Sequence, residues 1–297
     1  MRTDIENKAY LGLLLVALIY SSNLLVGKSV THLSPTVVSF MRTLVALVLV
    51  CAFFGAATLR EWPRYRTKLP QLILVALTGI AGFNIFIYAA LGSATASQVA
   101  VAETMIPAVT TLAAAFLLNE RLRPLQWLGV ALSFAGAVWV ISEGQPLEIL
   151  TSGGGGVAEM AMAVTLWVAY TLLVRRTLSD LPTFAVLPPL LAIAAAAQLP
   201  AALIWGNAAD IIVMGDIEVF AALLYLGIFP TVVAFVLYNQ AVIAVGPSRS
   251  AIFLNLLPIF TIAGEFVFFG EAITAPRILG AVAVIIGVSI VIRAKAR

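Results

Sequence analysis

The sequence has few charged residues for its length. Only 10% of its 297 residues are Asp, Glu, Lys or Arg, whereas 62% are hydrophobic, and the mean hydropathy is +1.07. Soluble domains average about 25% charged and about 45–50% apolar residues. This composition predicts an integral membrane protein. The net charge of +3 comes from basic residues scattered over short segments, which gives no basic patch for a nucleic acid.

Cysteine and histidine are almost absent as well. Cys51 is the single cysteine, so no disulfide can form within the chain, and we expect it to be a buried, apolar thiol. With His32 as the single histidine, a metal site of the Cys or His type is not expected. The chain also lacks a P-loop and an HExxH motif, which argues against an ATP-driven pump and against a metalloprotease. We therefore expect no enzyme activity and no cofactor.

Long hydrophobic runs are abundant. A helix needs about 20 predominantly apolar residues to cross the hydrocarbon layer, whereas strands of a membrane barrel would alternate in polarity. We predict an all-α integral membrane protein with ten transmembrane helices, the first of which is retained as an anchor. The predicted spans are Ala9–Val26, Ser34–Phe54, Leu69–Ala90, Thr95–Leu118, Pro124–Ser142, Val157–Val174, Leu181–Trp205, Val219–Asn239, Ser250–Phe269 and Ala275–Ile292.

Basic residues are distributed unevenly between alternate loops. With the N-terminus in the cytoplasm, only Lys28 and Arg277 fall in outer loops, and Arg42 lies inside a helix. An excess of Lys and Arg on the cytoplasmic side is the usual pattern. We predict a multi-pass protein of the cell inner membrane with both termini cytoplasmic. The inner basic residues are Arg2, Lys8, Arg60, Arg64, Arg66, Lys68, Arg121, Arg123, Arg175, Arg176, Arg249, Arg293, Lys295 and Arg297.

One pattern occurs twice in the chain, with a constant offset of 151 residues. Its members are Pro107, Glu120, Gly129 and Gly136, which recur as Pro258, Glu271, Gly280 and Gly287. The glycine run at 153–156 is a predicted outer connector between a first repeat, 1–152, and a second, 157–297. Five helices per repeat is an odd number, so the second repeat enters the membrane from the opposite side and the two are predicted to be inverted. Glycines seven residues apart predict smooth faces for close helix packing.

These motifs resemble those of the EamA family of the drug/metabolite transporter superfamily. The first half contains Leu18-Ile19-Tyr20-Ser21-Ser22-Asn23, Lys28, Pro35 and Arg42, and the second contains Leu166-Trp167-Val168-Ala169-Tyr170. Tyr20 occupies a position where the family usually has Trp. In the second half, the matching position does hold a Trp, Trp167. The resemblance implies ten helices in two repeats and export of amino acids and related small metabolites. The inverted repeats suit alternating access through a central cavity, and aromatic residues in the spans suit substrates with aromatic or apolar side chains. Efflux of lipophilic or quaternary cations is the alternative.

Three ionisable residues, Arg42, Glu103 and Glu265, lie inside predicted spans. Each costs at least about 2.5–3.5 kcal/mol on insertion scales, so each needs a reason to be there. Arg42 and Glu103 both lie roughly 12 Å below the outer surface, at ~1.5 Å per residue, and opposite charges at matched depth can form an ion pair. Two interpretations stay open: the pair is a structural bridge, or Arg42 receives a substrate carboxylate while Glu103 or Glu265 receives an ammonium group or a proton.

Polar and aromatic residues at helical spacing predict a shared cavity. Aromatic residues also anchor helices at the membrane surface, and Tyr238 is expected to be such an anchor. Pro107 and Pro258 occupy equivalent places and predict paired kinks that gate the cavity, with a static kink as the alternative; Pro188, Pro189 and Pro230 also fall within spans. The predicted substrate-binding residues are Tyr20, Asn23, Arg42, Asn84, Tyr88, Glu103, Trp167, Tyr170, Asn255 and Glu265.

The expected partners follow from this assignment. They are a small-molecule substrate, an amino acid, and the lipid bilayer, with no nucleic acid. The chain is expected to be a monomer or a weak dimer.

Overall fold

All regular secondary structure that the fold shows is helical. The computed structural model describes residues 2–93, 99, 102–118, 123–141, 144–147, 156–207, 210, 216–269 and 274–293. In the first part of the chain the elements are α1 (Arg2–Ser29), α2 (Pro35–Thr67), α3 (Leu69–Ala76), the π-helix η1 (Leu77–Gly82), α4 (Phe83–Ser93), α6 (Met105–Leu117) and α7 (Pro124–Ile141). In the second part they are α9 (Val157–Thr177), α10 (Leu187–Trp205), α12 (Ile217–Ile228), the π-helix η2 (Phe229–Ala234), α13 (Phe235–Val245), α14 (Pro247–Ala251), the 3-10 helix η3 (Ile252–Leu256), α15 (Leu257–Phe269) and α16 (Ala275–Arg293).

Each predicted span overlaps a helix, but several boundaries differ, among them those of α2 and α10. α2 continues to Thr67, well beyond the predicted end at Phe54, because its added residues are mostly good helix formers and their charges do not end a helix. α10 begins at Leu187, so Pro188 and Pro189 lie in its first turn. Both prolines lie within a span, as predicted, and in the first turn their missing N–H breaks no helical bond.

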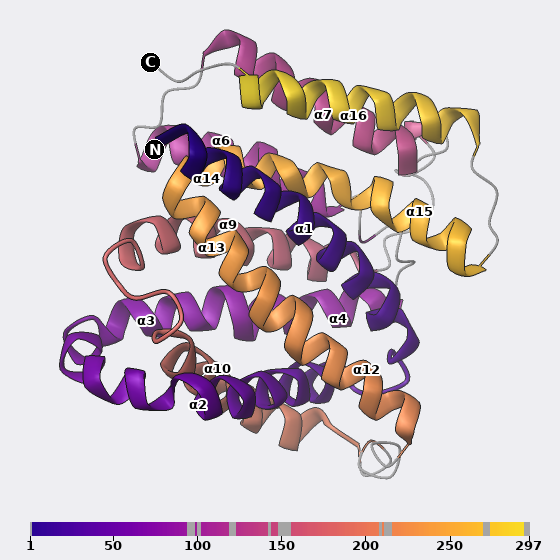
Figure 1. Cartoon of the computed structure of the whole chain (residues 1–297). Helices are drawn as coiled ribbons and strands as arrows, with labels where there is room; N and C mark the ends of the chain where they lie inside the picture. The colour runs from indigo at the N-terminus through magenta and orange to yellow at the C-terminus, as the bar shows by residue number, and fades with distance from the viewer. Residues whose placement is uncertain are drawn as a thin grey trace.

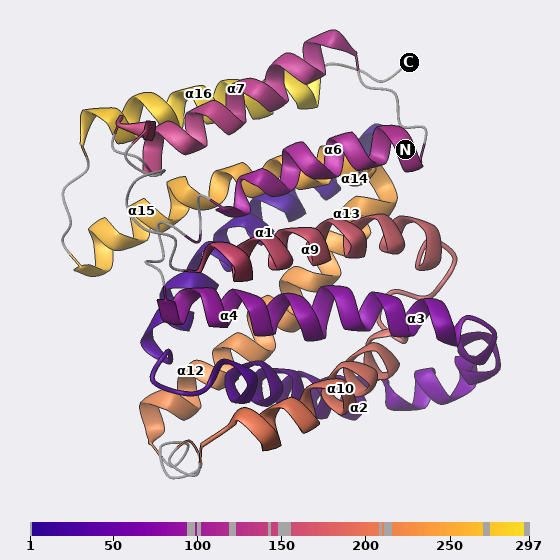
Figure 2. The same ribbon diagram turned by 180° about the vertical axis from the view of Figure 1, so that it is seen from behind.

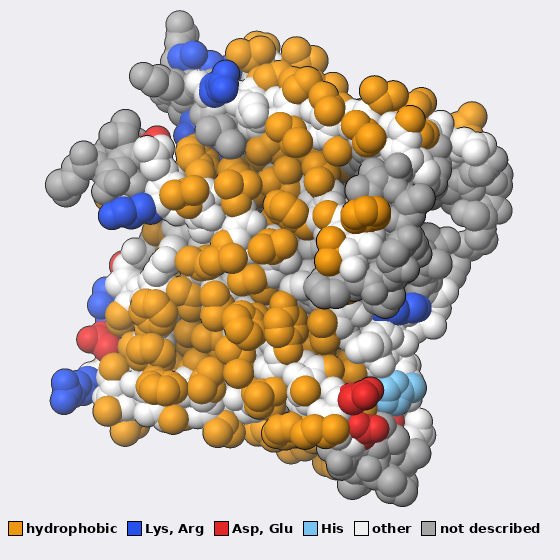
Figure 3. Space-filling view, turned by 45° about the vertical axis from the view of Figure 1, so that its right-hand side comes forward, with side chains coloured by type: hydrophobic (Ala, Val, Ile, Leu, Met, Phe, Trp, Pro, Cys, Tyr) orange, Lys and Arg blue, Asp and Glu red, His pale blue; other side chains and the backbone are white. Residues whose placement is uncertain are grey.

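The described helices include enough apolar segments for a multi-pass membrane protein. A broad band of hydrophobic side chains faces outward, and most Lys and Arg gather along one edge of it (Figure 3). Such a band is stable only in contact with lipid. Helices long and apolar enough to cross a membrane are Ile5–Ser29, Pro35–Thr67, Leu69–Ser93, Ala158–Thr177, Leu187–Trp205 and Ile217–Val245, and shorter apolar helices are Met105–Leu117, Pro124–Trp139 and Ile278–Val291.

Cys51 lies on the outer face of α2 and is exposed, so the prediction that it is buried in the core was wrong. Its neighbour Phe53 is 74% exposed, which shows that this face of the helix points away from the protein. The hydrocarbon layer is as apolar as a protein core. A thiol can therefore lie in an apolar environment here without being covered by protein.

Helices that are far apart in the sequence pack side by side. α1 packs on α13, α4 on α9, α2 on α10, and α7 on α16 (Figures 1 and 2). Every one of these pairs joins a helix of residues 2–141 to a helix of residues 156–293. The α7–α16 pair forms one side of the molecule, at the top of both views.

The paired glycines hold α7 and α16 in contact. A Cβ atom added at Gly129 would lie 2.7 Å from the carbonyl oxygen of Gly287, and one at Gly136 would lie 2.8 Å from that of Gly280. The predicted close packing is confirmed. The contact order, 129 with 287 and 136 with 280, also shows that the two helices run antiparallel.

Candidate functional site

Three irregular helical segments, η1, η2 and η3, meet at one internal cavity. Residues of these segments line it together with residues of α1, α2, α4, α9 and α13, and with Glu103 and Ile106. π-Helical turns are frequent at functional sites, because they redirect side chains and free backbone groups that a regular helix would use internally. The site is therefore built from the least regular part of the bundle.

The sequence of η2 explains its own irregularity. Pro230 has no N–H, so the carbonyl of Leu226 loses its usual α-helical donor. The hydroxyl of Thr231 donates to that carbonyl instead, at 2.7 Å. η3 ends just before Pro258, and α6 begins only two residues before Pro107. Each predicted kink thus coincides with a helix boundary or an irregular turn, while the gating role of the two prolines stays a prediction.

Arg42 is the most strongly held charged residue of the cavity. Its side chain is 3% exposed, and its guanidinium donates to Thr231 Oγ1 at 2.9 Å, to Asn23 Oδ1 at 3.0 Å and to the hydroxyl of Tyr88. Tyr88 in turn donates to Asn23 Oδ1 at 3.3 Å. All three acceptors are neutral, so they orient the guanidinium and replace part of its hydration without cancelling its charge.

Glu103 lies at the same cavity without an equivalent set of partners. It is 6% exposed, and its Oε2 atom has no hydrogen-bond partner among the residues that the structure describes. No ion pair within 4.0 Å joins it to Arg42. The structural bridge, one of the two open interpretations, is therefore not formed here, because the guanidinium is turned toward α1, α4 and η2 by its three neutral acceptors.

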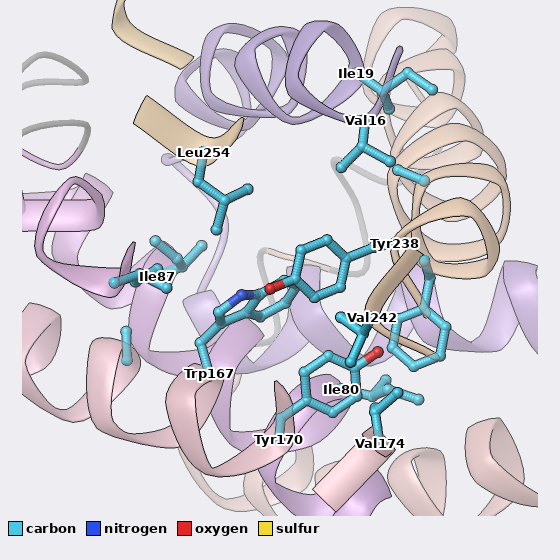
Figure 4. Packing of buried hydrophobic residues seen from close by; sticks show 14 of the residues in the cluster. Val16, Ile19, Ile80, Ile87, Trp167, Tyr170, Val174, Tyr238, Val242 and Leu254 are labelled. Atoms are coloured by element: carbon cyan, nitrogen blue, oxygen red, sulfur yellow. The ribbon is translucent and has the colours of Figure 1, made fainter. Parts of the chain in front are cut away.

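An aromatic cluster centred on Trp167 forms one wall. The Trp167 ring lies 4.4 Å from that of Phe83, 5.7 Å from that of Tyr20 in an edge-to-face arrangement, and 5.2 Å from that of Tyr238. Figure 4 shows Trp167, Tyr170 and Tyr238 lying next to one another in the core. Tyr238 is fully buried, so its predicted role as a surface anchor was wrong; α13 continues beyond it to Val245 and places it inside the bundle.

Tyr170 packs behind the cavity wall rather than on it. Its hydroxyl donates to Asn239 Oδ1, and its ring fills the space beside Gly79, where a Cβ atom would lie 2.1 Å from the Tyr170 ring. Gly79 is therefore needed for the close approach of η1 to α9. The π-helix and the aromatic wall support each other through this contact.

The structure brings together six of the predicted binding residues as cavity lining: Tyr20, Asn23, Arg42, Asn84, Glu103 and Trp167. Tyr88 joins them through its bond to Arg42. Asn255, by contrast, is fully buried and donates to Ser133 Oγ at 2.8 Å on α7. The side chain of Glu265, like Glu120 and Glu271, lies outside the described residues.

Several residues that line or support the cavity were not predicted from the sequence. Thr231 follows Pro230 in η2, and Asn239 precedes Gln240 in α13; among these residues only Pro230 was singled out from the sequence. Gly79, Phe83 and Phe235 carry no polar signal at all. The cavity itself has a free volume of about 30 Å³, which is room for only a few water molecules.

Comparisons with known proteins place these features in a class. The model of the EamA-like transporter family matches residues 7–142 and again residues 155–293. The chain is 26% identical over 225 residues to the uncharacterized transporter YyaM of Bacillus subtilis (strain 168), covering 75% of this chain and 73% of the relative. It is 28% identical over 291 residues to an uncharacterized transporter of Archaeoglobus fulgidus, covering 95% and 96%. A solved crystal structure with 18% identity shares the fold, with a TM-score of 0.73 and 98% of both chains covered.

The protein is therefore a multi-pass membrane transporter. It belongs to the EamA-like transporter family, whose model covers both parts of the chain.

Proposed function

We propose that the protein exports amino acids across the cell inner membrane by alternating access through this cavity. The observation that carries the proposal is the presence of two buried ionisable side chains, Arg42 and Glu103, that line one cavity without pairing. An α-amino acid bears a carboxylate and an ammonium group on one carbon and so complements both. Each protein charge would then replace water lost by a substrate charge. The direction, export, follows from the family resemblance.

The aromatic wall supports a substrate with an aromatic or apolar side chain. Tyr20, Phe83 and Trp167 present ring edges and faces to the cavity. Such surfaces bind apolar groups by area burial and by offset or edge-to-face contact. In this binding mode Arg42 and Glu103 fix the amino-acid backbone, and the aromatic residues select the side chain.

Two inverted five-helix repeats are part of the proposal, with halves at 1–152 and 157–297 and a connector at 153–156. The α7–α16 contact supports it: Gly129 contacts Gly287, and the residues equivalent to these two in the other half, Gly280 and Gly136, also contact each other. Reciprocal contact of this kind is expected across a two-fold axis. Because the two helices are antiparallel, such an axis would lie in the membrane plane.

The cavity walls support the same relationship. η1 begins at Leu77 and η2 at Phe229, an offset close to that of the repeated motif. Asn23 pairs with Tyr88. Asn239 corresponds to Tyr88 at the offset of 151 residues, and Tyr170 corresponds to Asn23 when Tyr20 is aligned with Trp167, at an offset of 147 residues; Tyr170 and Asn239 also pair. In the first half the Asn is on the first helix of the pair and the Tyr on the second, and in the second half the order is reversed. The Tyr–Asn hydrogen bond is therefore equivalent in the two halves, although each position holds the other residue type.

Alternating access also accounts for the size of the cavity. A free volume of about 30 Å³ is too small for any amino acid, so substrate entry needs the helices around it to separate. We assign that movement to the breaks next to Pro107 and Pro258, where few backbone bonds have to change. Both termini are placed in the cytoplasm, and the working unit is proposed to be a monomer or a weak dimer.

Efflux of lipophilic or quaternary cations is the second candidate. The observation in its favour is the unpartnered Oε2 of Glu103 beside Trp167 and Tyr20, because a carboxylate among aromatic rings suits an organic cation. Under this alternative Arg42 would be structural, held permanently by its three neutral acceptors.

Uptake into proteoliposomes tests the proposal. Radiolabelled amino acids are supplied one at a time, with and without a pH gradient, and a quaternary amine is added as competitor. Saturable accumulation of aromatic or apolar amino acids is expected, with weak competition by the amine. Accumulation of no amino acid would overturn the proposal, and transport of the amine alone would favour the alternative.

A further inference from the structure

We propose that an anionic phospholipid binds in a groove between α1, α15 and α16, with its acyl chains along the groove and its headgroup at the end where Arg249 and Arg293 lie. This groove is separate from the transport cavity. It opens on the outer face of the bundle, so the proposal needs only a membrane around the protein and does not rest on the proposed substrate.

The groove is large and apolar. Its free volume is about 680 Å³, and its lining includes Leu11, Leu14, Phe260 and Ile285. Leu11 is 67% exposed and Ile285 is 51% exposed. These side chains face the hydrocarbon layer. Along α1 the groove extends from Asn7 to Leu14, about 10 Å at ~1.5 Å per residue, which suits an extended section of an acyl chain.

A second groove adjoins the first on α16. Its free volume is about 440 Å³, and it shares Ile285 and Ser289 with the first groove. Two apolar grooves that meet along one helix can hold the two chains of a single phospholipid. A detergent or a free fatty acid would fill only one of them.

Two arginines lie at one end of both grooves, where the carboxylate of Glu6 also lies near Tyr10. Arg293 lines the second groove in the last turn of α16 and is exposed. Arg249 lies beside the hydroxyl of Tyr10, which lines the first groove, and its Nη2 atom is buried without a hydrogen-bond partner among the described residues. The start of α1, the end of α16 and α14 lie close together in Figure 1, so both cations belong to the same end of the bundle.

This charge decides which lipid is favoured. The phosphate group of either kind of lipid can accept hydrogen bonds from arginine. In a lipid whose headgroup carries no net charge, the negative phosphate is balanced within the headgroup, so only an anionic lipid brings a net negative charge to the two arginines. The predicted topology places this end at the cytoplasmic surface, where anionic lipids are within reach of a positively charged protein edge.

Lipid binding to the purified full-length protein tests the proposal. Native mass spectrometry and thermal melting are measured after addition of phosphatidylglycerol or phosphatidylcholine of the same chain length. We expect phosphatidylglycerol to remain bound at one equivalent and to raise the melting temperature by several degrees, with at least a fivefold preference over phosphatidylcholine. Equal binding and equal thermal shifts for the two lipids would overturn the proposal.

Matched variants locate the site. Leu14→Trp fills the first groove, whereas Leu15→Trp alters a side chain of the same helix that is 44% exposed and does not line it. Arg293→Gln removes the exposed cation, and Arg60→Gln removes an exposed cation of α2. We expect at least fivefold weaker binding of phosphatidylglycerol for Leu14→Trp and Arg293→Gln, and unchanged binding for the two controls. Equal effects of the groove and control variants would overturn the assignment.

Discussion

Arg42 and Glu103 line the same buried cavity and are not each other's partner. Arg42 donates to Asn23, Tyr88 and Thr231, and Glu103 Oε2 has no hydrogen-bond partner among the described residues. A protein that used the two charges only for stability would be expected to join them, because an unpaired buried charge costs several kcal/mol on the order of a full desolvation penalty. Their separation leaves both side chains available to a ligand, which supports the proposed binding of a zwitterion.

Replacement of Glu103 by Gln separates the functional from the structural interpretation. We expect Glu103→Gln to reduce amino-acid transport at least about tenfold, which corresponds to about 1.4 kcal/mol of lost interaction with the substrate. The melting temperature should be unchanged or higher, because a buried carboxylate without a partner destabilises the fold. Proteoliposome uptake and thermal melting measure the two effects.

Glu218→Gln is the matched control for that experiment, because Glu218 is an exposed carboxylate in the first turn of α12. It should leave transport unchanged. If Glu103→Gln transported normally but melted at a lower temperature, Glu103 would be a structural residue and the zwitterion proposal would be wrong.

Arg42→Lys keeps the charge but removes the fork of donors. A lysine ammonium cannot reach Thr231, Asn23 and Tyr88 with the geometry of a planar guanidinium. We expect a loss of about 1–3 kcal/mol in the free energy of unfolding, because buried acceptors are left unpaired. Transport should keep a residual rate with a raised KM for amino acids. An unchanged KM would show that Arg42 does not contact the substrate.

Much of the fold could be predicted from hydrophobic runs and from the repeated motif. Long apolar segments have few structural solutions in a membrane, which is why the all-α class and the helix order followed from composition alone. Helix ends were less predictable. From the sequence, Pro188 and Pro189 were expected in the interior of a span, whereas they lie in the first turn of α10. The sequence of an apolar run does not show where the loop ends and the helix begins.

The site was predicted only where polar residues stood out against an apolar background. Arg42, Asn23 and Glu103 did so, and they lie at the cavity. Asn255 stood out equally but faces Ser133 of α7. Helical spacing shows which residues share one face of a helix, but it does not show which helix packs against that face. The geometry that leaves Arg42 and Glu103 unpaired depends on η2, and no periodicity in the sequence predicts a π-helix there.

The glycine contacts of α7 and α16 predict a clear stability difference. In Gly136→Ala the new methyl group would meet the backbone of Gly280 at 2.8 Å, and backbone atoms cannot move aside cheaply. We expect a loss of about 1–3 kcal/mol in the free energy of unfolding. Gly55→Ala is the control, since nothing lies within 4 Å of its added Cβ atom, and it should be neutral or stabilising by up to about 1 kcal/mol. Equal melting temperatures would contradict the packing.

A surface ion pair predicts a pH effect outside the membrane. The ammonium group of Lys68 lies 2.6 Å from Asp180 Oδ1, and its hydrogen bonds hold the pKa of that carboxyl below its ordinary value of 3.8. A lowered folded-state pKa stabilises the protein above the unfolded-state pKa and loses this effect as the pH falls through the folded-state value. Asp180→Asn should therefore lower the melting temperature slightly at neutral pH. The difference should shrink in salt and disappear in strong acid; a difference that persists there would contradict the ion pair.

The exchanged Tyr–Asn pairs predict partial rescue by a double variant. Tyr170→Phe keeps the ring beside Gly79 but leaves Asn239, which is 2% exposed, without its donor, so we expect a loss of about 1–3 kcal/mol in the free energy of unfolding. Tyr170→Asn alone should cost more, because the ring is lost as well. The double variant Tyr170→Asn with Asn239→Tyr has the same order of residues as Asn23 and Tyr88 in the first half. Its melting temperature should therefore be higher than the two single losses together would give. A double variant no more stable than the sum of its single changes would mean that the two pairs are not equivalent.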